Sequence, residues 1–256
     1  IDSITPSTQA VFLTHVQGFN GLTEELLKVM EEKEIVLIED VCESHGATFK
    51  SKKLGSFGLI SNFSFYYAHH MSTIEGGMVC TNDEGIYQTL RMLRSHGMVR
   101  ESNNNSLRDK YLKESNDLNP EFIFAFPAYN VRNTEIGAVL GLNQLKRLDG
   151  NNISRTENFL YFLENLDSNI YKTNFDLDGS SNYAFNVVLN EKNFTLRNKV
   201  EDALHDAGIE FRRGSAGGGN QLRQPYLKDH IEEGYWNNFP NTEHIHHFAW
   251  YIGNFP

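Results

Sequence analysis

Ile35-Val-Leu-Ile-Glu-Asp40 is a run of aliphatic residues that ends in two acids. A continuous apolar run of this length predicts a strand buried on both faces, as in a parallel sheet. Another apolar run, Ala10 to His15, and a segment with apolar residues at helical spacing, Leu22 to Glu32, precede it. Together the three segments predict a strand–helix–strand unit and therefore an α/β protein.

The same alternation of strands and helices continues downstream. Strands are expected at residues 62–67 and 77–81, and an amphipathic helix at residues 83–94. Residues 100–119 show almost no apolar periodicity, which predicts a surface loop or a lid.

Helical patterns resume at residues 134–148 and 154–166, with Asp149-Gly-Asn-Asn152 predicted to break them. The rest of the chain is typical of a smaller α+β domain, so we expect one domain at 1–150 and another at 151–256. The elements expected in the second domain are a strand at 183–189, a helix at 196–207 and a strand at 209–212.

Composition disfavours several classes of partner and location. The formal net charge is −10, and no basic patch is visible, which disfavours nucleic acids and anionic membranes. The two cysteines, Cys42 and Cys80, lie in apolar runs, as expected for buried thiols in a reducing compartment. No apolar run approaches the roughly 20 residues that span a bilayer, and no signal pattern opens the chain. We therefore expect a cytoplasmic protein.

Two segments carry candidate chemistry. Glu39 and Asp40 end a strand at the sheet edge where α/β proteins bind ligands, although a strand-end acid can also simply cap a turn. Ser64-Phe-Tyr-Tyr-Ala-His-His70 brings a hydroxyl and two imidazoles past the next strand. Adjacent histidines on an extended segment point in opposite directions, so at most one of them faces a given site. A partly buried histidine beside a solvent-facing one is the alternative.

Five segments, in order, closely resemble the signature of the DegT/DnrJ/EryC1/StrS sugar aminotransferases. They are Glu39-Asp-Val-Cys-Glu-Ser-His-Gly-Ala47, Gly55-Ser-Phe-Gly58, Ser64-Phe-Tyr66, Glu75-Gly-Gly-Met-Val79 and Arg94-Ser-His-Gly97. The resemblance continues through 129–135 and 141–145, and more loosely through 224–227 and 251–254. It implies a fold-type I, aspartate aminotransferase-like PLP enzyme with a mainly parallel sheet. Residues 1–150 would be the C-terminal portion of its large domain, and 151–256 the small domain, incomplete at its end.

In that family the lysine that binds the cofactor aldehyde stands five residues after the serine of the SFY segment. This chain has His69 at that position. Imidazole forms no stable imine, so covalent attachment there is chemically unavailable. The substitution resembles a branch of 3-dehydratases acting on nucleotide-linked 4-keto-6-deoxyhexoses. The string Ala68-His-His-Met-Ser-Thr-Ile-Glu-Gly-Gly77 is most similar to members that act on GDP-4-keto-6-deoxymannose.

The resemblance implies a sequence of steps. PLP would take an amino group from L-glutamate to become PMP, which would condense with the C4 ketone of the sugar. His69 would abstract a proton from C4′ of the cofactor, and the C3 hydroxyl would leave. Hydrolysis would then release ammonia and a 4-keto-3,6-dideoxy sugar.

The resemblance also assigns roles by position. His69 is the expected catalytic base, Asp40 the partner of the pyridine nitrogen, and Ser64 a phosphate ligand. Glu43 would lie beside the phenolic oxygen, where many relatives have glutamine. In a homodimer with shared active sites, Asn130 and Arg132 would reach across the interface. Asn130 would bind cofactor phosphate, and Arg132 an anionic group of the substrate, unless Arg132 forms a surface ion pair.

Other signals are weaker. His244-Ile-His-His247 has no cysteine or acid at ligand spacing, so we expect no metal site. Arg212 and Arg213 would line the nucleotide-sugar entrance or form a solvated strand end.

Two broader questions stay open at this point. Family members carry a helix N-terminus that binds the PLP phosphate before the point where this chain begins, so we expect a partial sequence. A nucleotide-sugar 4-aminotransferase and a noncatalytic homologue are the competing functions. A stable 4-amino sugar product would indicate the first, and no substrate consumption the second.

Overall fold

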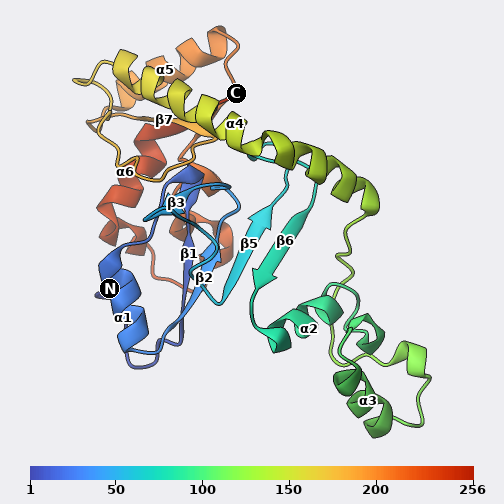
Figure 1. Ribbon diagram of the computed structural model, residues 1–256. Coiled ribbons are helices and arrows are strands. Elements are labelled where there is room, and N and C mark those ends of the chain that lie inside the picture. Colours follow the sequence, from blue (N-terminus) through green and yellow to red (C-terminus); the bar gives the residue numbers. More distant parts are fainter. The chain divides into compact units, whose positions relative to one another are not determined.

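The computed structural model describes residues 1–256 and divides them into two compact units (Figure 1). Unit 1 comprises Ile1–His15, Gly21–His45 and Lys52–Arg147, and unit 2 comprises Val16–Asn20, Gly46–Ser51 and Leu148–Pro256. Two short segments from the first part of the sequence therefore belong to unit 2. No helix combines the length and apolarity needed to cross a membrane.

Unit 1 is built on a four-stranded sheet of order β1-β2-β5-β6. Its strands are β1 (Ala10–Thr14), β2 (Val36–Asp40), β5 (Ile60–Ser64) and β6 (Gly77–Thr81). The first two pairs in this order are parallel and the last is antiparallel. The expected α/β class with a mainly parallel sheet is confirmed, and the carboxyl ends of β2 and β5 meet at one edge.

The helices of unit 1 begin at capping side chains. In α1 (Glu24–Glu32), Thr23 Oγ1 accepts a hydrogen bond from Leu26 N at 3.1 Å. In α2 (Glu84–Leu93), Asp83 Oδ1 accepts one from Ile86 N at 2.7 Å. These caps satisfy amides that have no partner within the helix, and they confirm the helices predicted in both places.

The prediction of a loop at 100–119 is wrong, because α3 (Asn105–Glu114) forms there. Asn104 caps this helix through a 3.0 Å hydrogen bond to Leu107 N. No residue of α3 is buried. An exposed helix needs no apolar face, so periodicity could not reveal it. Short 3-10 turns, Val99–Glu101 and Pro120–Phe122, flank it.

The predicted break at 149–152 is also wrong, because α4 runs without interruption from Glu135 to Asn165. A Cβ built at Gly150 would meet nothing within 4 Å, so no close contact requires glycine there. Glycine costs only about 1 kcal/mol relative to alanine inside a helix. Good helix formers on both sides outweigh that local cost.

Unit 2 contains a three-stranded antiparallel sheet of order β7-β9-β8. Its elements are β7 (Ala184–Val188), α5 (Phe194–Asp206), β8 (Phe211–Arg213), α6 (Pro240–Phe248) and β9 (Ala249–Gly253). The first three confirm the expected elements. Neither α6 nor the central strand β9 was predicted.

The remaining elements of the molecule are short. They are strands β3 (Thr48–Phe49) and β4 (Lys52–Lys53), and 3-10 turns at Val16–Gly18, Ala216–Gly218, Gln221–Arg223, Pro225–Leu227 and Tyr235–Asn238. Close backbone packing accounts for the segment at 16–20 within unit 2. Gly18 has φ +92°, and a Cβ there would lie 1.9 Å from Ser181 O. Only glycine allows that approach.

Candidate active site

The ends of β2 and β5 carry polar side chains on one face. Asp40 ends β2 and is paired in register with Asn62 of the parallel strand β5. Ser64 lies two residues beyond Asn62, so both side chains point to the same face. Glu39 and Ser61 point to the opposite face, where they are 0% and 1% exposed. Asp40, Asn62 and Ser64 are all partly exposed.

Two donors hold the carboxylate of Asp40. Its Oδ1 accepts a hydrogen bond from Cys42 N at 3.1 Å and another from Asn62 Nδ2 at 3.0 Å. Asn62 Nδ2 also lies 3.1 Å from Cys42 Sγ. Burial, followed by the hydrogen bond and charge of Asp40, raises the pKa of Cys42 to about 12. The thiol is therefore neutral at physiological pH beside an oriented carboxylate.

The segment after β5 folds back on itself. Ser64 Oγ accepts a hydrogen bond from Tyr66 N at 3.2 Å, and Tyr66 O accepts one from His69 N at 3.1 Å. The ring of His69 packs edge-on against that of Tyr66, with centroids 5.5 Å apart and planes at 74°. These contacts return His69 toward the end of β5.

The two adjacent histidines have different surroundings. His70 is 3% exposed and stacks on His45 at a centroid distance of 5.5 Å and an interplanar angle of 22°. His69 is only partly buried. His70 is therefore a packed core side chain, and His69 is the imidazole that remains accessible to a ligand.

Three of the predicted site residues affect the pKa of a fourth, His69. Burial lowers the pKa of His69 below the ordinary histidine value. The negative charge of Glu43, a hydrogen bond to the backbone of Ser64 and the charge of Asp40 oppose this effect without cancelling it. The structure thus brings the imidazole, the hydroxyl residue and both carboxylates to one edge of the sheet. At neutral pH the imidazole is a neutral base.

The other two predicted residues lie apart from this group. Asn130 forms an isolated antiparallel bridge with Ser95, and its Oδ1 accepts a hydrogen bond from Arg132 Nε at 3.1 Å. Both Asn130 and Arg132 are exposed. No hydrogen bond or ion pair joins them to Asp40, Glu43, Ser64 or His69 within the chain.

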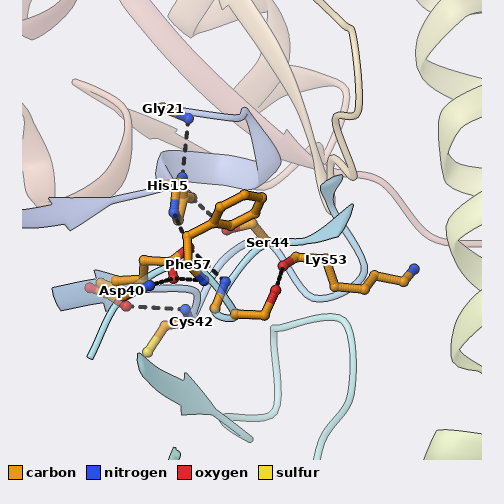
Figure 2. A network of polar contacts seen from close by, with 11 residues as sticks. His15, Gly21, Asp40, Cys42, Ser44, Lys53 and Phe57 are labelled. Atoms are coloured by element: carbon orange, nitrogen blue, oxygen red, sulfur yellow. Dashed lines mark hydrogen bonds and ion pairs between the residues drawn. The ribbon is translucent and has the colours of Figure 1, made fainter. Parts of the chain in front are cut away.

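On the opposite face of β2, the buried carboxylate of Glu39 organises a polar network (Figure 2). Its oxygens accept hydrogen bonds from the backbone N–H groups of Gly55 at 2.7 Å, Phe57 at 2.8 Å and Gly58 at 2.6 Å. Three N–H donors around one carboxylate form a compact anion-binding loop. Glu39 therefore fixes the loop beside the strand that presents Asp40.

His15, which directly follows β1, completes this network. Its Nδ1 accepts a hydrogen bond from Gly21 N at 3.1 Å, so Nε2 carries the proton that points at Glu39 Oε1, 3.4 Å away. Burial raises the pKa of Glu39, but the hydrogen bonds from His15 and the three backbone N–H groups lower it more. The net pKa lies below the ordinary glutamate value, and the buried carboxylate is ionised.

Sequence reasoning placed Glu39 on the wrong face and missed Asn62. Glu39 and Asp40 were both suspected at the ligand edge, and strand alternation would have separated them, because consecutive residues face opposite ways. Asn62 could be found only from the register of β2 against β5, which cannot be read from the sequence.

The histidine-rich segment of α6 is engaged within unit 2. His244 Nε2 lies 2.6 Å from Leu189 O, and His246 Nδ1 accepts a hydrogen bond from Asn220 N at 3.1 Å. His247 Nε2 lies 3.8 Å from a carboxylate oxygen of Glu243. The hydrogen bond from Arg223, with further help from Asn220, lowers the pKa of Glu243 to about 2.

Arg212 and Arg213, for which a substrate entrance and a solvated strand end were both considered, form ion pairs. Arg212 lies 3.2 Å from Glu210, and Arg213 lies 3.2 Å from Glu201. Both guanidinium groups are about half exposed. This matches the alternative of a solvated strand end.

The chain is similar in sequence and in structure to several known enzymes. The GDP-4-keto-6-deoxy-D-mannose 3-dehydratase of Escherichia coli O55:H7 is 32% identical over 256 residues, covering 99% of this chain and 65% of that protein. A solved structure described as the E. coli enzyme with bound hydrated PLP superposes with a TM-score of 0.84 at 31% identity, over 99% of this chain and 65% of its own. Another structure of a GDP-4-keto-6-deoxymannose 3-dehydratase, with a trapped PLP-glutamate geminal diamine, gives 0.83 at 29% identity, with 99% and 65% covered.

These comparisons confirm the expected fold class, that of the PLP-dependent aminotransferase-like enzymes. The chain spans just under two thirds of the length of these dehydratases. Residues 2–254 match the DegT/DnrJ/EryC1/StrS aminotransferase family. The chain therefore belongs to that family.

Proposed function

We propose that this chain is part of a PLP-dependent 3-dehydratase of nucleotide-linked 4-keto-6-deoxyhexoses, with GDP-4-keto-6-deoxymannose as substrate and L-glutamate as amino donor. One arrangement carries the proposal: His69, at the position where the resemblance implies the family lysine, interacts with Glu43, Ser64 and Asp40. A neutral imidazole there can move a proton but cannot bind the cofactor covalently. The names of the similar enzymes support the substrate class.

The residues present fit PLP chemically. The bound cofactor would supply an electron sink that stabilises the negative charge left when a proton is removed from the carbon next to its ring. Asp40 would hold the pyridine nitrogen, because its carboxylate is already oriented by two donors. Ser64 would donate its hydroxyl to the phosphate, and Glu43 would lie beside the phenolic oxygen.

His69 would perform the proton transfer that lets the C3 hydroxyl leave as water. Its lowered pKa keeps the imidazole unprotonated at neutral pH, as a base requires. Its partly buried ring, packed on Tyr66, restricts the orientation from which it would act. With no lysine at this position, nothing on the chain competes there for the cofactor aldehyde.

We further propose a homodimer in which Asn130 and Arg132 act on the active site of the partner. Both are exposed and lie in an apolar surrounding, since Tyr129 is 84% and Val131 is 69% exposed. The following helix, α4, exposes further large apolar side chains. They are Ile136 at 76%, Val139 at 67% and Leu142 at 65%. Contiguous exposed apolar surface of this kind marks an interface.

The assignment of 1–150 to the large cofactor-binding domain and of 151–256 to the small domain belongs to the same proposal. The cytoplasmic location stays a prediction.

A product analysis tests the function directly. The full native protein would be incubated with PLP, L-glutamate and GDP-4-keto-6-deoxymannose, and the sugar product identified by mass spectrometry. We expect ammonia and a sugar that has lost the C3 oxygen and retains a C4 ketone. A stable 4-amino sugar would instead identify an aminotransferase, and an unconsumed substrate would identify a noncatalytic homologue.

The His69→Lys variant tests the role of the imidazole. A lysine amine at that position should capture the PLP aldehyde, so borohydride treatment should fix the cofactor to the protein, as seen by intact mass. Wild-type protein should retain no cofactor after the same treatment, and dehydration by the variant should be suppressed. His70→Lys is the control, because that side chain is buried against His45. Covalent capture at neither position would contradict the placement of His69.

A further inference from the structure

Asn62 occupies a position that the proposed mechanism does not use. It lies on β5 directly beside Asp40, and its backbone is fixed by a 2.9 Å hydrogen bond from Val41 N to Asn62 O. Its side-chain amide donates to Asp40 Oδ1 at 3.0 Å. The strand ladder therefore aims this amide at the carboxylate.

We propose that Asn62 is a positioning residue for Asp40, which holds Oδ1 so that Oδ2 is presented to the pyridine nitrogen of PLP. This inference rests on the proposed function, in which Asp40 is the partner of that nitrogen. Asn62 itself does not touch the cofactor in this assignment. It acts through the orientation and charge of Asp40.

The chemistry of an amide suits this task. An asparagine N–H donates to a carboxylate but carries no charge, so it stabilises the ionised form without neutralising it. An ionised carboxylate is what keeps a pyridine nitrogen protonated. A charged lysine or arginine at the same place would compete with the pyridinium for Asp40.

A second donor makes the arrangement specific. Cys42 N binds the same oxygen of Asp40 at 3.1 Å, so two N–H groups converge on Oδ1 and neither takes Oδ2. Two fixed donors on one oxygen restrict rotation of the carboxylate about its Cβ–Cγ bond. Loss of the amide would leave Oδ1 with one backbone donor and a carboxylate that is free to turn.

The test uses the full native chain and PLP labelled with ¹⁵N in the pyridine ring. The ¹⁵N chemical shift reports whether the ring nitrogen is protonated, and an absorbance titration gives the affinity for PLP. We expect Asn62→Leu, which is close in size but has no donor, to lower the pH at which the ring nitrogen loses its proton. Affinity for PLP should fall about tenfold, as for loss of one hydrogen bond to a charged group.

Two other variants make the result specific. Ser61→Ala removes a buried hydroxyl from the neighbouring position on the opposite face of β5, and should leave the ¹⁵N titration and the affinity within about twofold of wild type. Asn62→Ser keeps a short donor and should give intermediate values, and it serves if Asn62→Leu does not fold. Thermal unfolding of every variant separates lost folding from lost positioning.

The outcomes separate this inference from the function on which it rests. Wild-type protein that binds PLP with a protonated ring nitrogen, while both Asn62 variants titrate as wild type does, overturns the role of Asn62 alone. Wild-type protein that binds no PLP, or binds it with an unprotonated nitrogen, overturns the role of Asp40 and with it the proposed function. A change in melting temperature with an unchanged ¹⁵N titration reduces Asn62 to a structural residue.

Discussion

The sheets of the two units differ in how their most buried side chains are held. In unit 1, β2 buries Leu37 and the carboxylate of Glu39, which accepts three backbone hydrogen bonds. In unit 2, the core cluster at β7 and β9 is apolar and includes Val187, Leu189 and Trp250. A buried polar group is stable only where hydrogen bonds replace its lost water, whereas apolar packing needs no defined partners. Glu39 thus relies on directional bonds, and the candidate chemistry lies on the other face of the same strand.

The largest effect should come from the apolar core of unit 2. Trp250 is 1% exposed and its Nε1 donates to Glu201 at 2.8 Å. We expect Trp250→Ala to lower the free energy of unfolding by about 3–5 kcal/mol, because it leaves a large cavity and removes one hydrogen bond to Glu201. Urea unfolding followed by circular dichroism measures the loss. Tyr161→Ala is the control, since that ring is 70% exposed and should matter little. An equal effect of both substitutions would refute the role given to this core.

A smaller, pH-dependent effect should come from the polar core of unit 1. Glu39→Gln keeps the shape of the side chain but replaces an acceptor oxygen by a donor that faces backbone N–H groups. At pH 7 we expect a loss of about 1–3 kcal/mol. Because the folded-state pKa of Glu39 is lowered, its contribution is complete above the unfolded glutamate pKa of about 4.3. The contribution is lost as the pH falls from there through the folded value.

The measurement for Glu39 is the difference in unfolding free energy between wild type and variant, followed as a function of pH. This difference should shrink as the solution is acidified below about pH 4. Glu32→Gln is the control, because Glu32 is 61% exposed and only faces Lys28 at 3.8 Å. A pH-independent difference would show that the charge of Glu39 is not what the three N–H donors recognise.

The smallest effect should appear on the ligand-facing side of unit 1. The charge of Glu43 raises the pKa of His69 against the larger effect of burial. Glu43→Gln should therefore lower the pKa of His69 further, and move the acidic limb of the activity profile to lower pH. An NMR titration of the His69 ring measures the pKa without turnover. Glu75→Gln, a nearby exposed carboxylate, should leave the titration unchanged. A rise in the pKa of His69 in Glu43→Gln would contradict this geometry.

The same contrast explains which elements could be predicted from the sequence. Strands with continuous apolar runs, such as β2, and helices with an amphipathic face, such as α2, can be predicted from the pattern of apolar residues along the chain. The helix α3 buries no residue and gave no such signal. In β9, Ala249-Trp-Tyr-Ile-Gly253 is short and follows the histidine-rich α6 directly, so no turn separates the two elements.

The candidate site was predictable to the extent that it depends on spacing along the chain. The resemblance to the family implies His69 through its spacing from Ser64, and the place of Asp40 at a strand end makes it a candidate. Asn62 and the partners of Glu39 depend on contacts between strands and loops that are remote in sequence. Such contacts are set by register and loop closure, which composition and periodicity do not encode.

The way in which Glu39 is held also constrains how the segment 55–58 can vary among related sequences. The carboxylate is recognised through main-chain N–H groups, so this recognition should tolerate exchange of the side chains of Ser56 and Phe57, except for proline at 57. Gly55 and Gly58 are different, because a Cβ at either would lie 2.8 Å or less from Phe63 or Leu37 O. Insertions and deletions should be excluded altogether, since they would move the amides off the acid. Related sequences should therefore conserve the length of the segment 55–58 and its two outer glycines more strictly than the two residues between them.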